Sequence, residues 1–192
     1  MLKTINNSTL WEEEKAYSDK LIKKDVRNNS AWNQRWFTTH QGNKHPPLPM
    51  HFAKSEAKYA IDIATMDPYN ESPLRYLVAL LEEQNKSSRL GREKQENDVG
   101  EGEEVKDDAF DSLLDLVGTK IEHLEETLSG GNESASLISA HIDILEMKSD
   151  LNSFEKGASM ANDLGTKFDV IRKKYWAMRE RKLRSKVTKS KE

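Results

Sequence analysis

The sequence predicts an all-α protein, an α-α superhelix in which about eight helices pair as antiparallel hairpins. Apolar residues recur at helical spacing almost throughout the chain, and short polar turns separate successive helices. No run alternates apolar and polar residues as a strand would, and there is no Asn-Gly turn. Since a hairpin of this kind buries its apolar stripe only against its neighbours, a row of them predicts a solenoid.

The composition excludes several kinds of site and several classes of protein. The 192 residues include no cysteine, which excludes a disulfide framework, a thiolate zinc site and a cysteine nucleophile within this chain. No run reaches the ~18 apolar residues of a membrane span, and the N-terminus lacks the apolar core of a secretory signal. The hydrophobic fraction of 35% is below the ~45–50% of globular domains, so part of the chain is expected to be unpacked. We expect a cytoplasmic protein.

Residues 9–84 are expected to form the first hairpins. One helix follows Thr9, and Ser30 is predicted to cap a second one. A loop at 41–50 holds three prolines in four positions, which a helix cannot continue through. A third helix then ends at Asp67-Pro68, and Ser72 is predicted to cap a fourth. The side chains expected in the core of these repeats are Trp32, Trp36, Leu74 and Leu77.

Residues 85–108 differ in composition, because they hold three apolar residues in 24. Such a segment buries too little surface to offset the entropy lost on ordering. We expect a disordered acidic loop here. C-terminal hairpins follow over 109–183, with caps predicted at Ser134, Ser153 and Asp169, and a basic tail over 184–192. The stretch from Arg179 onward carries a local charge of +5.

An internal repeat appears when the chain is shifted by 42 residues. Asp25 then falls on Asp67, and the Asn-x-Ser at 28–30 falls on that at 70–72, each with a large apolar residue two positions later. The polar part recurs at 132–134. Asn can tie the turn between two helices while Ser caps the second helix. The period therefore predicts equivalent turns stacked side by side.

These segments resemble the protein prenyltransferase alpha subunit family. The stretch Asp25-Val-Arg-Asn-Asn-Ser-Ala-Trp-Asn-Gln-Arg-Trp-Phe37 looks like one of its repeats, in the form shared by farnesyltransferase and type I geranylgeranyltransferase. Residues 68–77 are similar to the next repeat, with Leu74 where the family usually has Trp, and residues 169–176 resemble its C-terminal helix. The likeness spans 9–84 and 109–186, so we expect a C-terminal portion of such a subunit.

The resemblance implies a crescent of paired helices that wraps around a beta subunit. That partner holds the zinc, with magnesium as a further candidate metal, and most of the site for the isoprenoid diphosphate and the CaaX-protein substrate. The family's alpha subunit contributes a lysine from a repeat Lys-Asn-Tyr-x-x-Trp that is missing here, and Arg27 stands at the matching turn position. We therefore expect no catalytic, cofactor-binding or metal-binding residue in this chain, and no transferase activity from it alone.

Two readings stay open for the first repeat. In one, Trp32 fills the hairpin core while Arg35 pairs near the preceding turn. In the other, the surface of the second helix faces the beta subunit. The residues expected at such a partner interface are Asn28, Asn29, Asn33, Arg35, Asn70 and Glu71. His40, His45 and His51 surround the proline loop, but no His-Glu-x-x-His zinc motif is present, and we expect solvated histidines.

Two rival functions use the same helices. The first is a protein-binding adaptor of tetratricopeptide type without an enzymatic role, although the Trp-x-x-Leu-Gly-x-x-Tyr consensus is missing. The second is a degraded fragment without a stable fold, since the first hairpin exposes a face that a missing neighbour would cover. The basic tail could also touch nucleic acid or an acidic membrane, but it lacks interleaved aromatic residues, and we expect no nucleic-acid partner.

Overall fold

The computed structural model describes residues 8–43, 46–98, 108–128 and 132–189, and these ranges hold α-helices and no strand. The helices in chain order are α1 (Ser8–Lys24), α2 (Asn29–Gly42), α3 (Met50–Met66), α4 (Glu71–Asp98), α5 (Asp108–Leu128), α6 (Ala135–Lys148), α7 (Leu151–Asp163) and α8 (Lys173–Lys189). A short π-helix, η2 (Leu164–Phe168), and a 3₁₀ turn, η3 (Val170–Arg172), connect α7 to α8. The predicted all-α class is confirmed.

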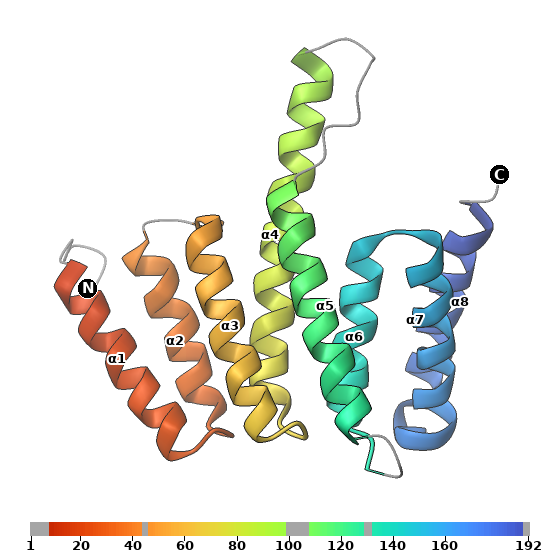
Figure 1. Ribbon diagram of the computed structural model, residues 1–192, viewed down its shortest axis with the longest axis horizontal. Helices are drawn as coiled ribbons and strands as arrows, with labels where there is room; N and C mark the ends of the chain where they lie inside the picture. Colours follow the sequence, from red (N-terminus) through yellow and green to blue (C-terminus); the bar gives the residue numbers. More distant parts are fainter. Residues whose placement is uncertain (1–7, 44–45, 99–107, 129–131, 190–192) are drawn as a thin grey trace.

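The helices stand in a row of antiparallel pairs, with α1 at one end and α7/α8 at the other (Figure 1). Within the row, α1 packs on α2, α3 on α4, α5 on α6 and α7 on α8. Between the first three pairs, α4 contacts α2 and α6 while α3 contacts α5, and the last pair joins the row mainly through the packing of α7 on α6. This two-layered row is the predicted solenoid of helical hairpins.

Equivalent turns of successive hairpins are linked by hydrogen bonds. The amide Nδ2 of Asn70 donates to the carbonyl of Val26 at 2.7 Å, and the hydroxyl of Ser134 donates to the carbonyl of Pro68 at 2.8 Å. Val26 and Pro68 are equivalent in the 42-residue repeat. Each turn therefore offers the same carbonyl to the cap residue of the next repeat, and the sequence period is a period in space.

The helix caps differ in part from the prediction. The side chain of Asn28 accepts the Ala31 N–H and that of Asn70 accepts the Ser72 N–H, so the asparagines, two residues before the predicted Ser30 and Ser72, begin α2 and α4. Their longer side chains reach the free N–H groups of the first turn. Ser134 caps α6 as predicted.

The other two predicted caps are also displaced. Asp150, rather than Ser153, caps α7, because its carboxylate accepts the Ser153 N–H. Asp169 makes no side-chain cap bond; its carboxylate instead accepts the indole N–H of Trp176 at 2.7 Å. Asp169 therefore fixes the last buried tryptophan to the connection that precedes α8.

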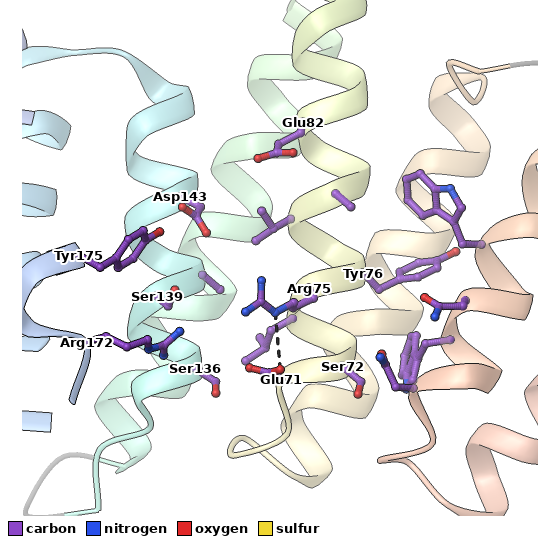
Figure 2. Close-up of a pocket in the computed structure, with 18 of the residues that line it drawn as sticks. Glu71, Ser72, Arg75, Tyr76, Glu82, Ser136, Ser139, Asp143, Arg172 and Tyr175 are labelled. Atoms are coloured by element: carbon purple, nitrogen blue, oxygen red, sulfur yellow. Dashed lines mark ion pairs between the residues drawn. The ribbon is translucent and has the colours of Figure 1, made fainter. Parts of the chain in front are cut away.

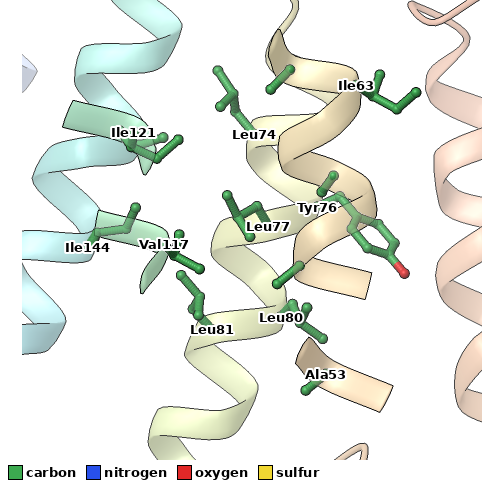
Figure 3. Packing of buried hydrophobic residues seen from close by; sticks show 14 of the residues in the cluster. Ala53, Ile63, Leu74, Tyr76, Leu77, Leu80, Leu81, Val117, Ile121 and Ile144 are labelled. Carbon is green, nitrogen blue, oxygen red and sulfur yellow. The ribbon is translucent and has the colours of Figure 1, made fainter. Parts of the chain in front are cut away.

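The main core runs along the row and contains the predicted repeat residues. Trp32, Leu74 and Leu77 are buried, and Trp36 is half-buried against the same cluster. Figure 3 shows Leu74, Leu77 and Leu81 of α4 pointing toward Val117 and Ile121 of α5 and Ile144 of α6, while Tyr76 points to the other side. Helix α4 is thus buried on two flanks, which explains its dense apolar stripe.

The last hairpin has a second cluster of its own, which consists of Ile142, Phe154, Ala158, Ala161, Leu164, Trp176 and Leu183. A side-chain Cβ added at Gly165 would lie 3.0 Å from the Cβ of Trp176, so the close approach of η2 to α8 favours glycine there. The end of the row therefore has a compact core anchored by Trp176.

The expected loop over 85–108 is wrong for residues 85–98, which continue α4 as helix. Elongating an existing helix needs no new nucleus, and this stretch is rich in Arg, Lys, Glu and Gln, which favour helix. Ser88 is buried one turn beyond the buried Gln84, whose amide donates to the Leu48 carbonyl. Residues 99–107 lie outside the described residues.

Candidate partner-binding groove

An open groove of about 640 Å³ crosses the layer formed by the even-numbered helices. Its lining residues come from the exposed sides of α2, α4 and α6 and from the η3–α8 segment (Figure 2). Four hairpins therefore contribute to one continuous surface, although the residues involved are up to 150 positions apart in the sequence.

The floor of the groove is the exposed stripe of α4. Glu71, Arg75, Val78 and Glu82 recur at spacings of four, three and four and so share one helix face. The Nε of Arg75 lies 3.7 Å from a carboxylate oxygen of Glu71, and this ion pair is marked in Figure 2. The opposite face of α4 is the buried leucine stripe, which fixes the orientation of these charges.

One wall of the groove is built around Arg179 of α8. Its Nη2 donates to Asp143 Oδ1 and to Glu146 Oε2, both at 2.9 Å, and its Nη1 donates to the Tyr175 hydroxyl at 3.1 Å. Burial raises the pKa of Asp143, although the Arg179 charge opposes the shift. Glu146 is also partly buried, but hydrogen bonds from Lys182 and Lys186 outweigh that effect and hold its pKa at about 2.

The other wall is aromatic. The indole of Trp36 stacks on the His40 ring with centroids 4.1 Å apart and meets Tyr76 edge-on at 5.6 Å. A second hollow of about 610 Å³ adjoins it and shares Trp36, Ala79 and Glu82 with the groove. Pro46, Pro47 and Leu90 line this part, so the depression continues along the extended half of α4.

Of the six residues predicted at a partner interface, three line the groove and three do not. Asn29, Asn33 and Glu71 line the groove and are exposed. Asn28 and Asn70 are instead used within the turns as helix caps, and the buried Asn70 also links two hairpins. The sequence could not separate these roles, because residues that tie a turn lie next to residues that face outward.

The prediction that Arg35 lies at a partner interface is wrong, because the side chain is buried. It is 5% exposed, so it does not belong to an open surface; its Nε donates to Glu56 Oε2 at 2.7 Å and its Nη2 to Oε1 at 3.0 Å. Lys15 and the Tyr76 hydroxyl bind the same carboxylate. The Tyr59 ring lies under the guanidinium, 3.5 Å from its central carbon. This network joins helices α1 to α4, so Arg35 pairs inside the core with a residue of α3 and neither near the preceding turn nor at an open surface.

Sequence reasoning missed Glu56 and most of the far wall. A usable signal for Glu56 is its spacing from Ala53, Ala57 and Ala60, which places it on the buried face of α3, where a carboxylate needs a partner. Arg172, Tyr175 and Arg179 meet the α4 stripe only because the hairpins stack. No local pattern connects residues 100 positions apart.

Within the described ranges, no group of three or more His, Asp or Glu side chains lies close enough to hold a metal ion. His40 is buried and its Nε2 lies 3.1 Å from a Glu83 oxygen, whereas His51 is exposed; His45 lies outside the described residues. No helix in the described part of the chain is long and apolar enough to cross a membrane.

Stacked hairpins with a shared groove define the class as an α-α repeat protein. The protein prenyltransferase alpha subunit repeat matches residues 11–41, which cover most of α1 and α2. The chain is also 29% identical over 167 residues to the protein farnesyltransferase/geranylgeranyltransferase type-1 subunit alpha of Dictyostelium discoideum. That alignment covers 86% of this chain and 43% of the relative.

Two plant proteins of the same name also match. The identity is 40% over 77 residues with the one from Arabidopsis thaliana and 35% over 75 residues with that from Pisum sativum. These alignments cover 40% and 39% of this chain, and 23% and 22% of the relatives. The chain spans less than half the length of the curated relatives it matches. The predicted resemblance to the protein prenyltransferase alpha subunit family is confirmed, and the chain carries that family's repeat.

Proposed function

We propose that the chain serves as a portion of the alpha subunit of a heterodimeric CaaX protein prenyltransferase in the cytoplasm. In this role it supports a beta subunit, and the complex transfers a farnesyl or geranylgeranyl group from its diphosphate to a cysteine thiolate. The names of the relatives from Dictyostelium discoideum and Arabidopsis thaliana, both type-1 alpha subunits, support the assignment.

The shape and chemistry of the groove carry the proposal. The groove is open, it is built by four hairpins, and its lining combines acidic and basic side chains with aromatic rings that include Trp36 and Tyr175. A small-molecule site is usually a concave pocket with mostly apolar walls that encloses its ligand. An extended surface with Trp, Tyr and Arg side chains suits another folded polypeptide, since these residues are enriched at protein interfaces.

The residues present determine which roles we assign to this chain and to the beta subunit. In the proposed complex a zinc ion held by the beta subunit would lower the pKa of the substrate thiol and so supply the thiolate nucleophile near neutral pH. The chain itself has no cysteine, and we assign it no catalytic or metal-binding residue. Its contribution is a preformed surface that holds the beta subunit, and we expect no transferase activity from the chain alone.

Co-expression with a type-1 prenyltransferase beta subunit tests the proposal. We expect the two chains to co-purify at one-to-one stoichiometry, as measured by light scattering on the eluted complex. The informative variant is the charge swap Arg75→Glu with Glu82→Arg, which keeps the net charge but reverses the pattern of the groove floor. We expect it to weaken binding at least tenfold, because like charges across an interface are strongly unfavourable.

The matched control is Glu13→Lys with Lys20→Glu, an equally spaced swap of two exposed residues on α1, outside the groove. It should bind as the parent chain does. A helical, cooperatively folded chain that does not bind the beta subunit would contradict the proposal and favour the adaptor. A chain without a cooperative melt would favour the degraded fragment.

A further inference from the structure

The end of the row opposite α1 carries an exposed patch that the groove does not use. It combines apolar side chains with cationic ones, and we call it the α8 edge patch. Its residues are Val170, Ile171, Lys173, Lys174, Met178 and Arg181. We propose that the α8 edge patch binds the surface of an anionic lipid bilayer. This inference is independent of the proposed function.

The apolar members of the patch are unusually open. The side chain of Ile171 is 98% exposed, and those of Val170 and Met178 are 52% and 51% exposed. Single exposed apolar residues are common on proteins, but three within nine positions of the η3–α8 segment form a patch that favours burial in a partner phase.

The charge around these residues is strongly positive. Segment 167–189 contains ten Lys or Arg residues and two acidic ones, in a chain whose net charge is −3. Some of these cations already have an internal ion-pair partner, as Arg179, Lys182 and Lys186 share the carboxylate of Glu146. In contrast, Lys173, Lys174 and Arg181 form no ion pair with any described residue. Their charge is therefore available to an external anion.

Helix geometry places the free charges beside the apolar side chains. Trp176 and Leu183 are buried and mark the inner face of α8. Ile171, Lys174, Met178 and Arg181 follow at spacings of three, four and three on the outer face. Lys174 is rotated by about 100° from its neighbour Tyr175, which lines the groove. A partner in the groove would thus leave the patch accessible.

This combination fits a bilayer better than another macromolecule. A fully protruding isoleucine needs a soft, apolar phase to enter, and interfacial membrane segments pair such residues with Lys and Arg that meet anionic headgroups. Protein interfaces are depleted of lysine, which is the dominant cation here. Nucleic acid would gain from the charges but would leave Ile171 and Val170 without a partner.

Vesicle co-sedimentation of the full 192-residue chain tests the inference. The probes are vesicles of phosphatidylcholine alone and vesicles with 30% phosphatidylserine, at 0.15 M salt. We expect binding to the anionic vesicles only. Lys173→Glu with Lys174→Glu should weaken it at least 25-fold, because each basic residue near an anionic surface contributes about fivefold. Ile171→Ser should weaken it about tenfold, since one buried aliphatic side chain is lost.

Matched controls separate the patch from general charge and hydrophobicity. Lys20→Glu with Lys54→Glu changes the net charge equally at exposed positions far from α8, and Met66→Ser removes another exposed apolar side chain. Both should bind vesicles like the parent chain, and circular dichroism should show the same helicity for all variants. Absence of binding, an unchanged affinity of Ile171→Ser, or tighter binding to a DNA oligonucleotide than to the vesicles would each overturn the inference.

Discussion

The two ends of the row each contain an arginine bound to carboxylates, and the two clusters differ in their access to water. Arg35 and Glu56 are enclosed between α1 and α4, with side chains 6% and 1% exposed. Arg179 and Glu146 sit at the wall of the groove, with side chains 12% and 17% exposed. The first cluster is closed by Tyr59 and Tyr76, whereas the second is ringed by Lys182 and Lys186.

Burial changes how much the same kind of ion pair contributes to stability. Burial alone would raise the pKa of Glu56, but the Arg35 charge and the hydrogen bonds from Arg35 and Lys15 hold it below its usual value. A buried charge that loses its partner cannot be rescued by water, so removing one member of this pair alone should strongly destabilise the fold. The outer cluster can exchange partners with solvent, so its contribution is smaller and depends on salt.

The largest effect is expected from Glu56→Ala. The change leaves the Arg35 guanidinium buried without its carboxylate and should lower the free energy of unfolding by about 3–5 kcal/mol. Urea unfolding followed by circular dichroism measures it. The joint replacement Arg35→Met with Glu56→Leu should recover much of the loss, and a Glu56→Ala variant as stable as the parent would refute the comparison.

A smaller effect is expected from Glu146→Gln at the outer cluster. Three cations lose a shared carboxylate, yet water can solvate them, and the loss should be about 1–2 kcal/mol. The same urea titration at 0.05 M and 1 M salt should show this difference shrinking as salt rises, because exposed charges are screened. A loss equal to that of Glu56→Ala, or one independent of salt, would show that the two clusters do not differ.

The pH dependence of stability tests the outer cluster in another way. The pKa of Glu146 in the folded chain is about 2, below its ordinary value of 4.5. Its stabilising effect is therefore present above about pH 4.5 and is lost as pH falls toward 2. After allowance for screening, this loss should be about 1 kcal/mol, and Glu146→Gln should remove it from the acid side of a thermal-melting profile. An unchanged acid profile in that variant would contradict the assignment.

The joint between the two ends gives the smallest predicted change. Ser134→Ala removes both the cap of α6 and the hydrogen bond to Pro68, and it should cost about 0.5–1 kcal/mol by thermal melting. Ser153→Ala is the comparison variant, because it removes only the hydrogen bond from that hydroxyl to Asp150 Oδ2, while Asp150 still caps α7 through the Ser153 N–H. A larger loss at Ser153 than at Ser134 would show that the cap assignments are reversed.

Much of the fold could be predicted from the sequence, because the information is local. The apolar spacing defines the helices, and the 42-residue repeat marks equivalent turns. Trp32 and Leu74 lie at equivalent positions in the helices that follow these turns, and both are buried. The missed helix over 85–98 has a physical cause: its composition argues against a core, but a helix that already exists needs no core to continue.

The groove was predictable only in part. Asn29, Asn33 and Glu71 lie beside the repeat motif and line the groove. The motif could not show that Arg35 points inward to a glutamate 21 positions away. The far wall at Arg172 and Arg179 depends on how the last hairpin stacks. Properties set by the packing of one hairpin on another have no signature within a single helix.

The shared carbonyls of Val26 and Pro68 also bear on how the chain reaches its native state. The Val26 carbonyl accepts the Trp32 indole N–H within its own hairpin and gains a second donor, Asn70, when the following hairpin docks. The Pro68 carbonyl accepts Ser134 in the same way, so assembly can proceed stepwise from α1/α2 toward α7/α8 as the polypeptide emerges from the ribosome. Each folded hairpin then provides the surface on which the next hairpin packs after its synthesis.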